Sequence, residues 1–381
     1  MQFQRKHILF LASWYPERNS LDNGDFIQRH AQSVALLHDV TVVHAVKDPK
    51  LKDSKFEIEY RKQNGVNEII VYVKAARFRP FNFINLLQGF LLGVQQVKTF
   101  DLIHLNVIFP AGVVALYLKS KYKVPLVLTE HWSGLQKNNY KKLALYKRFF
   151  IRRILENVDY LLPVSLYLEE NIKRIHSDVR SKIIPNVIDL NNFKRRVEEV
   201  KKNETIHFLH LSNLKDDVKN ISGILNASKQ LAKKGYPFKL SIGGNGDLTF
   251  IQEFVTKNHL VDYISVFGRL EHHMVAEKMK SADCFILFSR YENQPCVQIE
   301  SFASGLPVIS SDVGGIKNFF PSDFGILIES ENEDQLCEAM IEVIEGRDFA
   351  SVEKMYEYVK FNFSKEEISQ QYHQIYQDLI K

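Results

Sequence analysis

Cysteine is scarce in this chain, and its spacing excludes folds that depend on it. The 381 residues hold only Cys284, Cys296 and Cys337, an odd number with no Cys-x-x-Cys pair. This pattern argues against a disulfide framework and a zinc ribbon, and it fits a reducing cytoplasm. Glycine and proline are also few, at 17 and 11 residues, which excludes a collagen-like, low-complexity or disordered chain.

Long apolar runs are absent as well. A membrane span needs roughly 18 apolar residues, and the longest candidate, Phe83–Val97, is interrupted by asparagine and glutamine. The start of the chain imitates a signal peptide, since Arg5-Lys6-His7 precedes the apolar run Ile8–Ala12. That run is about half the usual length. We interpret it as a first buried strand, and any membrane contact of the chain must then be peripheral.

An excess of one charge sign is also missing. Fifty basic against 45 acidic residues leave a net charge of +5, too little to predict nonspecific wrapping of nucleic acid. The remaining composition is that of a globular protein, with 45% hydrophobic and 25% charged residues. A length of 381 residues exceeds one ordinary core and indicates two domains.

Short apolar runs alternate with amphipathic segments along most of the sequence. The runs are rich in valine, isoleucine and leucine without clean alternation, which is typical of strands buried on both faces. This alternation predicts α/β domains with open parallel sheets covered by helices. The expected strands are His7–Ala12, Val40–Ala45, Ile69–Val73, Leu102–Leu105, Leu126–Thr129, Tyr160–Val164, Ile183–Val187, Ile206–Leu211, Phe238–Ile242, Ile264–Phe267, Cys284–Phe288, Val308–Ser310 and Gly325–Ile328. The expected helices include Phe26–Leu37, Leu86–Val97, Lys141–Leu155, Leu166–Ile175 and Lys365–Ile380.

A highly charged segment, Lys194–Glu204, divides the alternation into two halves and is interpreted as a solvated connector. We therefore expect an N-terminal domain over residues 1–190 and a C-terminal domain over residues 191–363. Ser364, followed three residues later by Glu367, predicts a capped final helix over residues 364–381, whose apolar face must pack on a domain. Two doubly wound, Rossmann-like domains facing across a cleft would bind ligands at the carboxyl ends of their strands.

One glycine-rich turn, Gly243-Gly244-Asn245-Gly246, follows an expected strand. Such a turn lets backbone N–H groups approach a phosphate, although a tight turn without a ligand explains it equally well. A nicotinamide-binding fingerprint would need a third glycine at the position of Thr249. An NAD-dependent oxidoreductase is therefore a disfavoured alternative.

The segment Ser289–Gly315 carries more information. Pro295 is suited to the first turn of a helix, so Glu292 lies in the preceding loop and Glu300 inside the helix. Two carboxylates thus flank a helix N-terminus that could hold phosphate, and carboxylates accept hydrogen bonds from sugar hydroxyls. By spacing alone, two surface carboxylates near a helix start explain the pattern better, because the helix dipole favours them there. Gly314-Gly315 adds a second turn of small residues after the next strand.

The whole segment resembles the donor-binding region of GT-B-fold glycosyltransferases, especially glycosyltransferase family 4. The family's mark is a Glu-x7-Glu pair followed by A-x-G-x-P-V-I-x-x-x-x-G-G, which Ala303, Gly305, Pro307-Val308-Ile309 and Gly314-Gly315 match. The resemblance covers most of the chain. Its other matches are Gly24-Asp25-Phe26, Thr129-Glu130-His131, Pro185–Asp189, Asn213–Lys219, Phe267-Gly268, Asp283–Leu287 and the last helix.

The resemblance implies a GT-B architecture and transfer of a sugar from a nucleotide diphospho-sugar with retention at the anomeric carbon. By this resemblance Glu300 holds the ribose, Glu292 the donor-sugar hydroxyls and Lys219 the diphosphate. His131 contacts the donor sugar near the reacting carbon. The remaining donor-binding positions it implies are Gly24, Asn213, Gly244, Gly268, Arg269, Asn293, Gly314 and Gly315, with base contacts near Gly268-Arg269 made through the backbone.

Lys219 and the helix start near Asn293 supply positive potential for the leaving diphosphate, so no metal and no cofactor are expected. Two departures from the family pattern stand out. Asn213 occupies the place of a phosphate-binding arginine, so Lys215 or Arg290 compensates, the donor is held differently, or activity is lost. Asn293-Gln294-Pro295-Cys296 replaces the usual glycine and aromatic residue after Glu292 and could alter the sugar pocket. A non-catalytic protein that binds sugar nucleotides is therefore the main alternative.

Basic and aromatic residues interleave in Lys137–Arg153, which has no acid, and again in Arg77–Phe83. Such a surface binds anionic lipid, although an ordinary helix with a charged outer face has the same pattern. The resemblance favours the first interpretation, because many family members glycosylate lipid-linked acceptors. We expect a cytoplasmic enzyme of cell-surface polysaccharide or glycolipid synthesis, with a nucleotide-sugar donor, a glycan or lipid-linked acceptor, and peripheral contact with the inner face of the plasma membrane.

Overall fold

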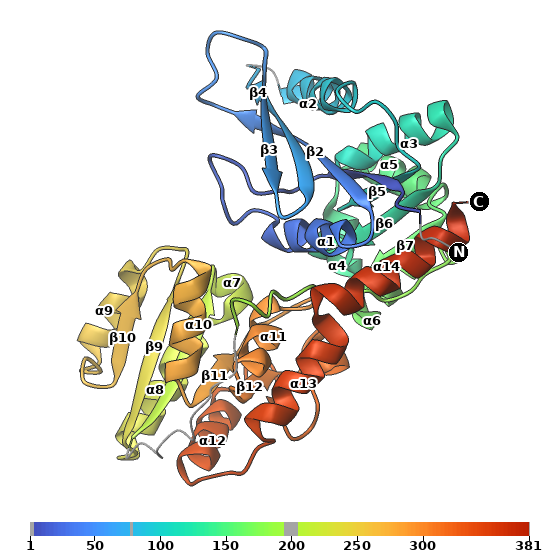
Figure 1. Cartoon of the computed structure of the whole chain (residues 1–381). Helices are drawn as coiled ribbons and strands as arrows, with labels where there is room; N and C mark the ends of the chain where they lie inside the picture. Colours follow the sequence, from blue (N-terminus) through green and yellow to red (C-terminus); the bar gives the residue numbers. More distant parts are fainter. Residues whose placement is uncertain (1–3, 77–78, 194–204, 381) are drawn as a thin grey trace. The chain divides into compact units, whose positions relative to one another are not determined.

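The computed structural model (Figure 1) describes residues 4–76, 79–193 and 205–380. The chain divides into two compact units: unit 1 comprises residues 1–187 and 363–381, and unit 2 comprises residues 188–362. The chain therefore passes between the units twice, and its C-terminal helix belongs to unit 1. The expected connector Lys194–Glu204 lies outside the described residues, as do Arg77 and Phe78 of the second basic-aromatic segment.

Unit 1 is built on a seven-stranded sheet in the order β3-β4-β2-β1-β5-β6-β7. All neighbouring strands are parallel except the edge strand β3, which runs antiparallel to β4. The carboxyl ends of the six parallel strands therefore meet at one edge of the sheet. The strands are β1 (His7–Ala12), β2 (Asp39–Asp48), β3 (Phe56–Gln63), β4 (Val66–Lys74), β5 (Leu102–Asn106), β6 (Leu126–Glu130) and β7 (Tyr160–Pro163).

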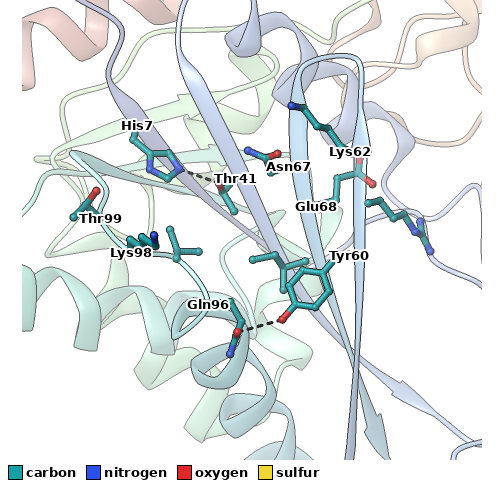
Figure 2. Close-up of a pocket in the computed structure, with 12 residues that line it drawn as sticks. His7, Thr41, Tyr60, Lys62, Asn67, Glu68, Gln96, Lys98 and Thr99 are labelled. Carbon is teal, nitrogen blue, oxygen red and sulfur yellow. Dashed lines mark hydrogen bonds between the residues drawn. The ribbon is translucent and has the colours of Figure 1, made fainter.

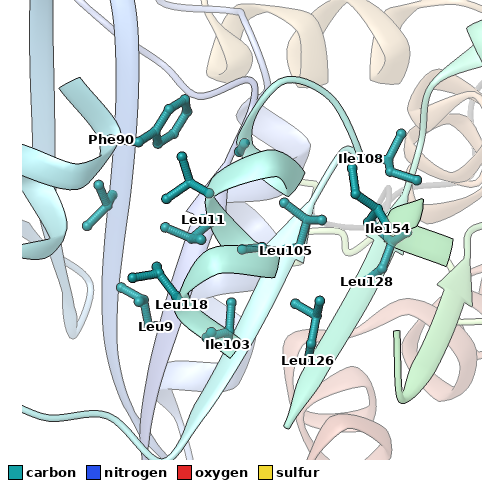
Figure 3. Close-up of a cluster of buried hydrophobic side chains, with 14 of the residues drawn as sticks. Leu9, Leu11, Phe90, Ile103, Leu105, Ile108, Leu118, Leu126, Leu128 and Ile154 are labelled. Atoms are coloured by element: carbon teal, nitrogen blue, oxygen red, sulfur yellow. The ribbon is translucent and has the colours of Figure 1, made fainter. Parts of the chain in front are cut away.

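Helices cover both faces of this sheet. On one face α1 (Asp25–Ala35) packs along α14 (Lys365–Leu379), and both bury apolar side chains against the strands. The other face carries α2 (Arg79–Val94), α3 (Ala111–Tyr122), α5 (Leu145–Leu155) and α6 (Leu166–Lys173). Figure 3 shows this second core, in which Phe90, Leu118 and Ile154 from the helices meet leucines and isoleucines of the central strands. This double coverage explains why the central strands read as continuous apolar runs.

Unit 2 has an all-parallel six-stranded sheet in the order β10-β9-β8-β11-β12-β13. A hydrophobic core lies between this sheet and three helices, α8 (Ile221–Lys233), α9 (Thr249–Lys257) and α12 (Glu333–Ile344). The helices α10 (His272–Ser281), α11 (Cys296–Ala303) and α13 (Val352–Phe363) complete the unit. The strands are β8 (Ile206–Ser212), β9 (Phe238–Gly244), β10 (Ile264–Phe267), β11 (Cys284–Leu287), β12 (Val308–Ser311) and β13 (Gly325–Ile328). The expected class of two Rossmann-like α/β domains is confirmed.

Three local expectations were wrong or incomplete. The run Ile183–Val187 is not a strand. Ile184 and Val187 fill the core beside α14, and the chain leaves β7 after the Ile184 N–H donates to the Pro163 carbonyl at 3.1 Å. The edge strand β3 was not expected, since its apolar residues alternate with charged ones. The helix expected over Lys141–Leu155 is broken before Leu145, and α4 (Lys137–Lys142) precedes the break.

The final helix is capped as expected, with the Glu367 backbone N–H donating to the Ser364 hydroxyl at 3.2 Å. Within the ranges that the structure describes, no helix combines the length and the apolar character needed to cross a membrane.

Candidate functional site

The loops that follow four strands of unit 2 touch one another at the carboxyl edge of the sheet. The loop after β8 bonds to the loop after β9, with the Asn245 N–H donating to the Ser212 carbonyl at 3.1 Å. It also bonds to the loop after β11, with the Arg290 N–H donating to the Val218 carbonyl at 2.8 Å. The loop after β11 meets the loop after β12, since the Gly315 N–H donates to the carbonyl of Glu292 at 3.3 Å.

Lys219 and Glu292 form an ion pair at the centre of these loops. Lys219 ends the short helix α7 (Asp216–Lys219), and Glu292 lies between β11 and α11, as expected. Their side chains are only 14% and 11% exposed. The Ser289 hydroxyl donates a second hydrogen bond to Oε1 of Glu292 at 2.8 Å. The two residues predicted to hold diphosphate and sugar are therefore partners in this structure.

Gly314 lies against the backbone of the Glu292 loop. Its φ of 59° is in the left-handed region, and an added Cβ would come within 1.8 Å of the Glu292 carbonyl oxygen. No larger residue fits this position without moving the loop. Gly314 and Gly315 thus join Lys219 and Glu292 in one cluster, which we call the donor cluster.

Two more predicted residues lie at the carboxyl ends of β8 and β9. Asn213 is exposed, and its side-chain oxygen accepts a hydrogen bond from the Lys215 N–H at 3.3 Å, the pattern of an Asx turn. Gly244 ends β9 with a φ of 140°, and an added Cβ would lie 1.8 Å from the Ser212 carbonyl oxygen. The glycine at this position is therefore explained by the close approach of two loops.

The last predicted residues of unit 2 follow β10 and β11 or lie in α11. Asn293 is half-buried three residues before α11, and Glu300 is buried inside that helix. Pro295 is the residue immediately before α11, one position earlier than expected. Gly268 and Arg269 are exposed at the carboxyl end of β10, on the same edge of the sheet.

In unit 1, Gly24 precedes α1 with a φ of 73°, and an added Cβ would lie 2.7 Å from the Trp14 carbonyl carbon. Gly24 therefore fixes the loop after β1. His131 directly follows β6, and its ring packs on Phe26 of α1 with a centroid distance of 4.5 Å. The structure thus places these two predicted positions after β1 and β6, the strands on either side of β5.

Glu130, the residue before His131, is fully buried and organises this corner. Its carboxylate accepts backbone N–H bonds from Ile108, His131 and Trp132 at 2.7–2.8 Å. Burial raises the pKa of Glu130 to about 7, although the three N–H donors act in the opposite direction. Glu130 holds the loops after β5 and β6 together and so fixes the backbone at His131.

A buried polar network lies beneath His131. Tyr372 of α14 bonds to Nδ1 of His30 at 2.8 Å and to the Thr129 hydroxyl at 3.3 Å. His104 bonds to Thr129 and to the hydroxyl of Tyr376, both at 2.6 Å. His104 is buried and bonded on both ring nitrogens, so it belongs to the core of unit 1.

Burial also fixes the charge of these imidazoles. It lowers the pKa of His30 to about 3 and moves the pKa of His104 and His131 well below the usual value. Asn186 partly offsets this shift for His30 and His131. The three rings are therefore neutral at pH 7, so His131 can donate or accept a hydrogen bond but carries no charge.

A separate pocket of about 700 Å³ lies at the amino-terminal edge of the unit 1 sheet (Figure 2). It is lined by the first residues of β1, β2 and β4 and by the end of β3, and hydrogen bonds join His7 to Thr41 and Tyr60 to Gln96. None of the predicted site residues lines it. Because Gly24 and His131 follow the carboxyl ends of strands, this pocket belongs to the opposite edge of the sheet.

Three supporting residues were not predicted. Ser289 holds Glu292, Glu130 holds the loop of His131, and His30 contacts the His131 ring with a centroid distance of 5.3 Å. Ser289 and Glu130 lie at strand ends, and this position could have marked them as candidate site residues. Their hydrogen bonds could not be read from the sequence. Within the described ranges no group of three or more histidine, cysteine, aspartate or glutamate side chains could hold a metal ion.

Family models match both halves of the chain. The model described as "Glycosyltransferase Family 4" matches residues 27–192, and the model described as "Glycosyl transferases group 1" matches residues 190–360. The chain belongs to glycosyltransferase family 4. It is therefore a glycosyltransferase, and the resemblance found in its motifs is confirmed.

Relatives and solved structures extend this assignment. This family 4 chain is 26% identical, over 98% of its length and 99% of the relative, to the putative teichuronic acid biosynthesis glycosyltransferase TuaC of Bacillus subtilis (strain 168). It is 26% identical, over 77% of its length and 70% of the relative, to the alpha-monoglucosyldiacylglycerol synthase of Streptococcus pneumoniae. Anabaena Alr3699/HepE in complex with UDP and glucose aligns with a TM-score of 0.75 at 16% identity, over 98% of this chain and 100% of that one. The fold is GT-B.

Proposed function

We propose that this glycosyltransferase moves a sugar from a nucleotide diphospho-sugar to a glycan or lipid-linked acceptor, with retention at the anomeric carbon. The observation that carries the proposal is the Lys219–Glu292 ion pair within the donor cluster. A cation and a carboxylate, both largely shielded from water, are the groups that a diphosphate and a sugar hydroxyl require. The complex of Anabaena HepE with UDP and glucose supports a nucleotide-sugar donor.

In this proposal the bond between the anomeric carbon and the diphosphate oxygen breaks, and its electron pair stays on the diphosphate. Lys219 stabilises the resulting charge together with N–H groups at the start of α11. The acceptor oxygen bonds to the anomeric carbon on the same face, and its proton passes to the departing diphosphate. Glu292 holds the sugar hydroxyls, Glu300 holds the ribose, and neutral His131 hydrogen-bonds the sugar without adding charge.

The remaining predicted donor contacts stay part of the proposal. Gly314 and Gly315 keep the backbone close to the diphosphate, and Asn293 borders the sugar. Gly268 and Arg269 are exposed at the end of β10, where backbone atoms could read the base. Because Lys219 supplies the cation, we infer that the reaction needs no metal, and activity should survive in excess chelator.

The acceptor is assigned only by class. The relatives include a putative glycosyltransferase of teichuronic acid biosynthesis and a monoglucosyldiacylglycerol synthase, which support an enzyme of cell-surface polysaccharide or glycolipid synthesis. We assign unit 1 to the acceptor, with Gly24 and His131 at its reacting end. Such an enzyme would work in the cytoplasm.

The second candidate is a protein that binds sugar nucleotides without turning them over. It is favoured by Asn213, which is uncharged and whose side-chain oxygen accepts a hydrogen bond from its own turn. Hydrolysis separates the two candidates, because an enzyme slowly transfers the sugar to water. We expect release of nucleoside diphosphate from one member of a panel of nucleotide sugars, and its loss in Glu292→Ala. Tight binding of a nucleotide sugar with no release and no transfer would favour the second candidate.

We further propose that unit 1 docks on an anionic membrane. Five large apolar side chains are exposed together on α2 and α5: Phe81, Ile84, Leu145, Tyr146 and Phe149. The two helices meet there, because Phe83 stacks on Phe109 and contacts the ring of Tyr146. Leu145 is 78% exposed, whereas a helix that packs its apolar face on the core would bury such a leucine.

Basic side chains surround this apolar group. Lys141, Lys142 and Arg152 are exposed beside it, and the Lys147 ammonium lies 5.5 Å from the centre of the Phe109 ring. Apolar residues flanked by cations match the boundary between anionic headgroups and acyl chains. The expected site of action is therefore the inner face of the plasma membrane.

Sedimentation with vesicles tests this docking. We expect binding to phosphatidylglycerol vesicles at low salt and little binding to phosphatidylcholine vesicles. The double variant Leu145→Asp/Phe149→Asp should stay in solution. The matched control is Phe361→Asp, since Phe361 is an exposed phenylalanine of unit 2. Equal vesicle binding by Leu145→Asp/Phe149→Asp and by Phe361→Asp would contradict the proposal. So would a wild type that binds no vesicles.

A further inference from the structure

The short helix that presents Lys219 is flanked by two residues in the left-handed backbone conformation. The helix α7 has only four residues, Asp216–Lys219. Leu214 before it and Asn220 after it have φ values of 54° and 52°. Asparagine tolerates this conformation, but leucine rarely adopts it unless surrounding contacts impose it. The position of Lys219 therefore depends on whatever holds α7.

Arg290, on the neighbouring loop after β11, contacts both ends of α7. Its Nη1 group donates to the carbonyl of Asp216, and its Nη2 group donates to Oδ1 of Asn220 at 2.7 Å. Its backbone N–H donates to the Val218 carbonyl at 2.8 Å. Its Nε donates to Glu331 at 2.7 Å, which orients the guanidinium plane. Arg290 thus spans the helix from its first residue to the residue after its last.

Lys219 lies between these contacts and points to Glu292, two residues after Arg290. One loop therefore holds α7 by its backbone through Arg290 and pairs with its ammonium group through Glu292. Nε, Nη1 and Nη2 of Arg290 already donate to three different acceptors. Three of the five guanidinium N–H groups are therefore engaged. Turning the guanidinium toward a phosphate would break these bonds and remove a donor from the Asn220 side chain, which is 2% exposed.

We propose that Arg290 is a positioning residue that sets Lys219 for the donor diphosphate and does not itself bind the diphosphate. This inference rests on the proposed function. From the sequence, Arg290 was one residue that could compensate for Asn213, and the proposal gives Arg290 a specific role. Arg290 then compensates by fixing the geometry of Lys219, and the neutral Asn213 leaves the diphosphate with fewer direct cationic contacts.

Hydrogen exchange tests the positioning without any ligand. In Arg290→Ala the backbone amides of residues 214–220 should exchange at least tenfold faster, while the strands of unit 2 keep their protection. Arg347→Ala is the control, because Arg347 pairs with Glu342 at the end of α12 and touches no part of α7. Unchanged exchange at 214–220 in Arg290→Ala would overturn the inference.

Binding supplies the second measurement, with UDP, GDP, ADP and inorganic pyrophosphate as probes in calorimetry. Arg290→Ala should weaken the best probe about tenfold in the wild type but less than twofold in the Lys219→Met background, because a positioning residue acts only through Lys219. Arg290→Lys keeps the charge but cannot make the three side-chain bonds, so it should bind as weakly as Arg290→Ala.

Two results would overturn the inference while leaving the proposed function intact. One is an equal loss in both backgrounds, and the other is full rescue by Arg290→Lys, since either means that the charge of Arg290 acts on the ligand. A different result identifies failure of the proposed function. If the wild type binds none of the four probes, the role given to Lys219 is wrong, whatever exchange shows at 214–220.

Discussion

The ammonium group of Lys219 and the carboxylate of Glu292 neutralise each other while largely shielded from water. Each is therefore the main compensation for the other's charge, with the Ser289 hydroxyl as a further hydrogen-bond partner of Glu292. A donor diphosphate would compete with Glu292 for Lys219 and would free the carboxylate for a sugar hydroxyl. Under the proposed function, the pair would link diphosphate binding to sugar binding.

Removing the charge of either Lys219 or Glu292 should destabilise the protein more than removing both charges. Lys219→Met leaves the Glu292 carboxylate uncompensated and should lower the free energy of unfolding by about 3 kcal/mol. In Lys219→Met/Glu292→Gln both charges are removed, so most of the lost free energy of unfolding should be restored. Urea titrations of the single and double variants measure this. Additive losses in the double variant would mean that the two charges do not interact.

Gly314→Ala should shift the Glu292 loop, because the added Cβ would lie 1.8 Å from the Glu292 carbonyl oxygen and the φ of 59° is unfavourable for alanine. We expect a loss of about 1–2 kcal/mol in stability from the backbone conformation alone, together with loss of nucleoside diphosphate binding. The stability control is Gly268→Ala, whose Cβ would meet nothing within 4 Å. Equal melting temperatures for the two variants would contradict this assignment.

Tyr376→Phe should destabilise unit 1 by about 1–3 kcal/mol, because Nδ1 of buried His104 would lose its partner. Tyr60→Phe is the matched control, since its hydroxyl bonds to Gln96 at an exposed position. That control should change stability by less than about 0.5 kcal/mol. Thermal unfolding compares the two, and a control as damaging as Tyr376→Phe would argue against a structural role for the network.

Unit 1 should lose stability in mild acid. Its buried histidines have lowered pKa values, so the unfolded chain binds more protons below about pH 6.5, and stability falls as pH drops toward 4. Glu130, with a pKa raised to about 7, opposes this trend as a single group. The histidines of unit 1 with a lowered pKa are His30, His38, His44, His104, His131 and the half-buried His373. In unit 2 the pKa of His210 is lowered.

Urea denaturation between pH 5 and pH 8 tests the acid effect. In His30→Gln the fall in stability with acid should be shallower than in the wild type, because one buried group no longer titrates. His273→Gln, at an exposed position of α10, should reproduce the wild-type slope. A wild type whose stability is unchanged or higher at pH 5 would show that the imidazoles are not shielded as described.

The sequence predicted most of the fold because continuous apolar runs identify strands that are covered on both faces. It failed where that rule does not apply: β3 is an edge strand with alternating polarity, and Ile183–Val187 is apolar because it fills a core outside the ladder. The sequence placed Lys219, Glu292 and Gly314-Gly315 after strand ends, and parallel strands end at one edge of a sheet, so their proximity was expected. Their donor-binding roles stay a prediction.

Other parts of the site could not be predicted. The bond from Ser289 to Glu292 and the contacts of Arg290 with both ends of α7 depend on side-chain directions in loops. No periodic pattern encodes such directions. The burial of His104 beneath Tyr376 likewise joins residues 272 positions apart in the chain.

The most direct test of the account is the affinity of the wild type and Lys219→Met for one nucleoside and its diphosphate, measured by calorimetry. The account predicts that the wild type binds the diphosphate far more tightly than the nucleoside. It also predicts that Lys219→Met loses about 3 kcal/mol of diphosphate binding and leaves nucleoside binding unchanged. Equal affinity of both proteins for the diphosphate would contradict the assignment of Lys219, and therefore the account.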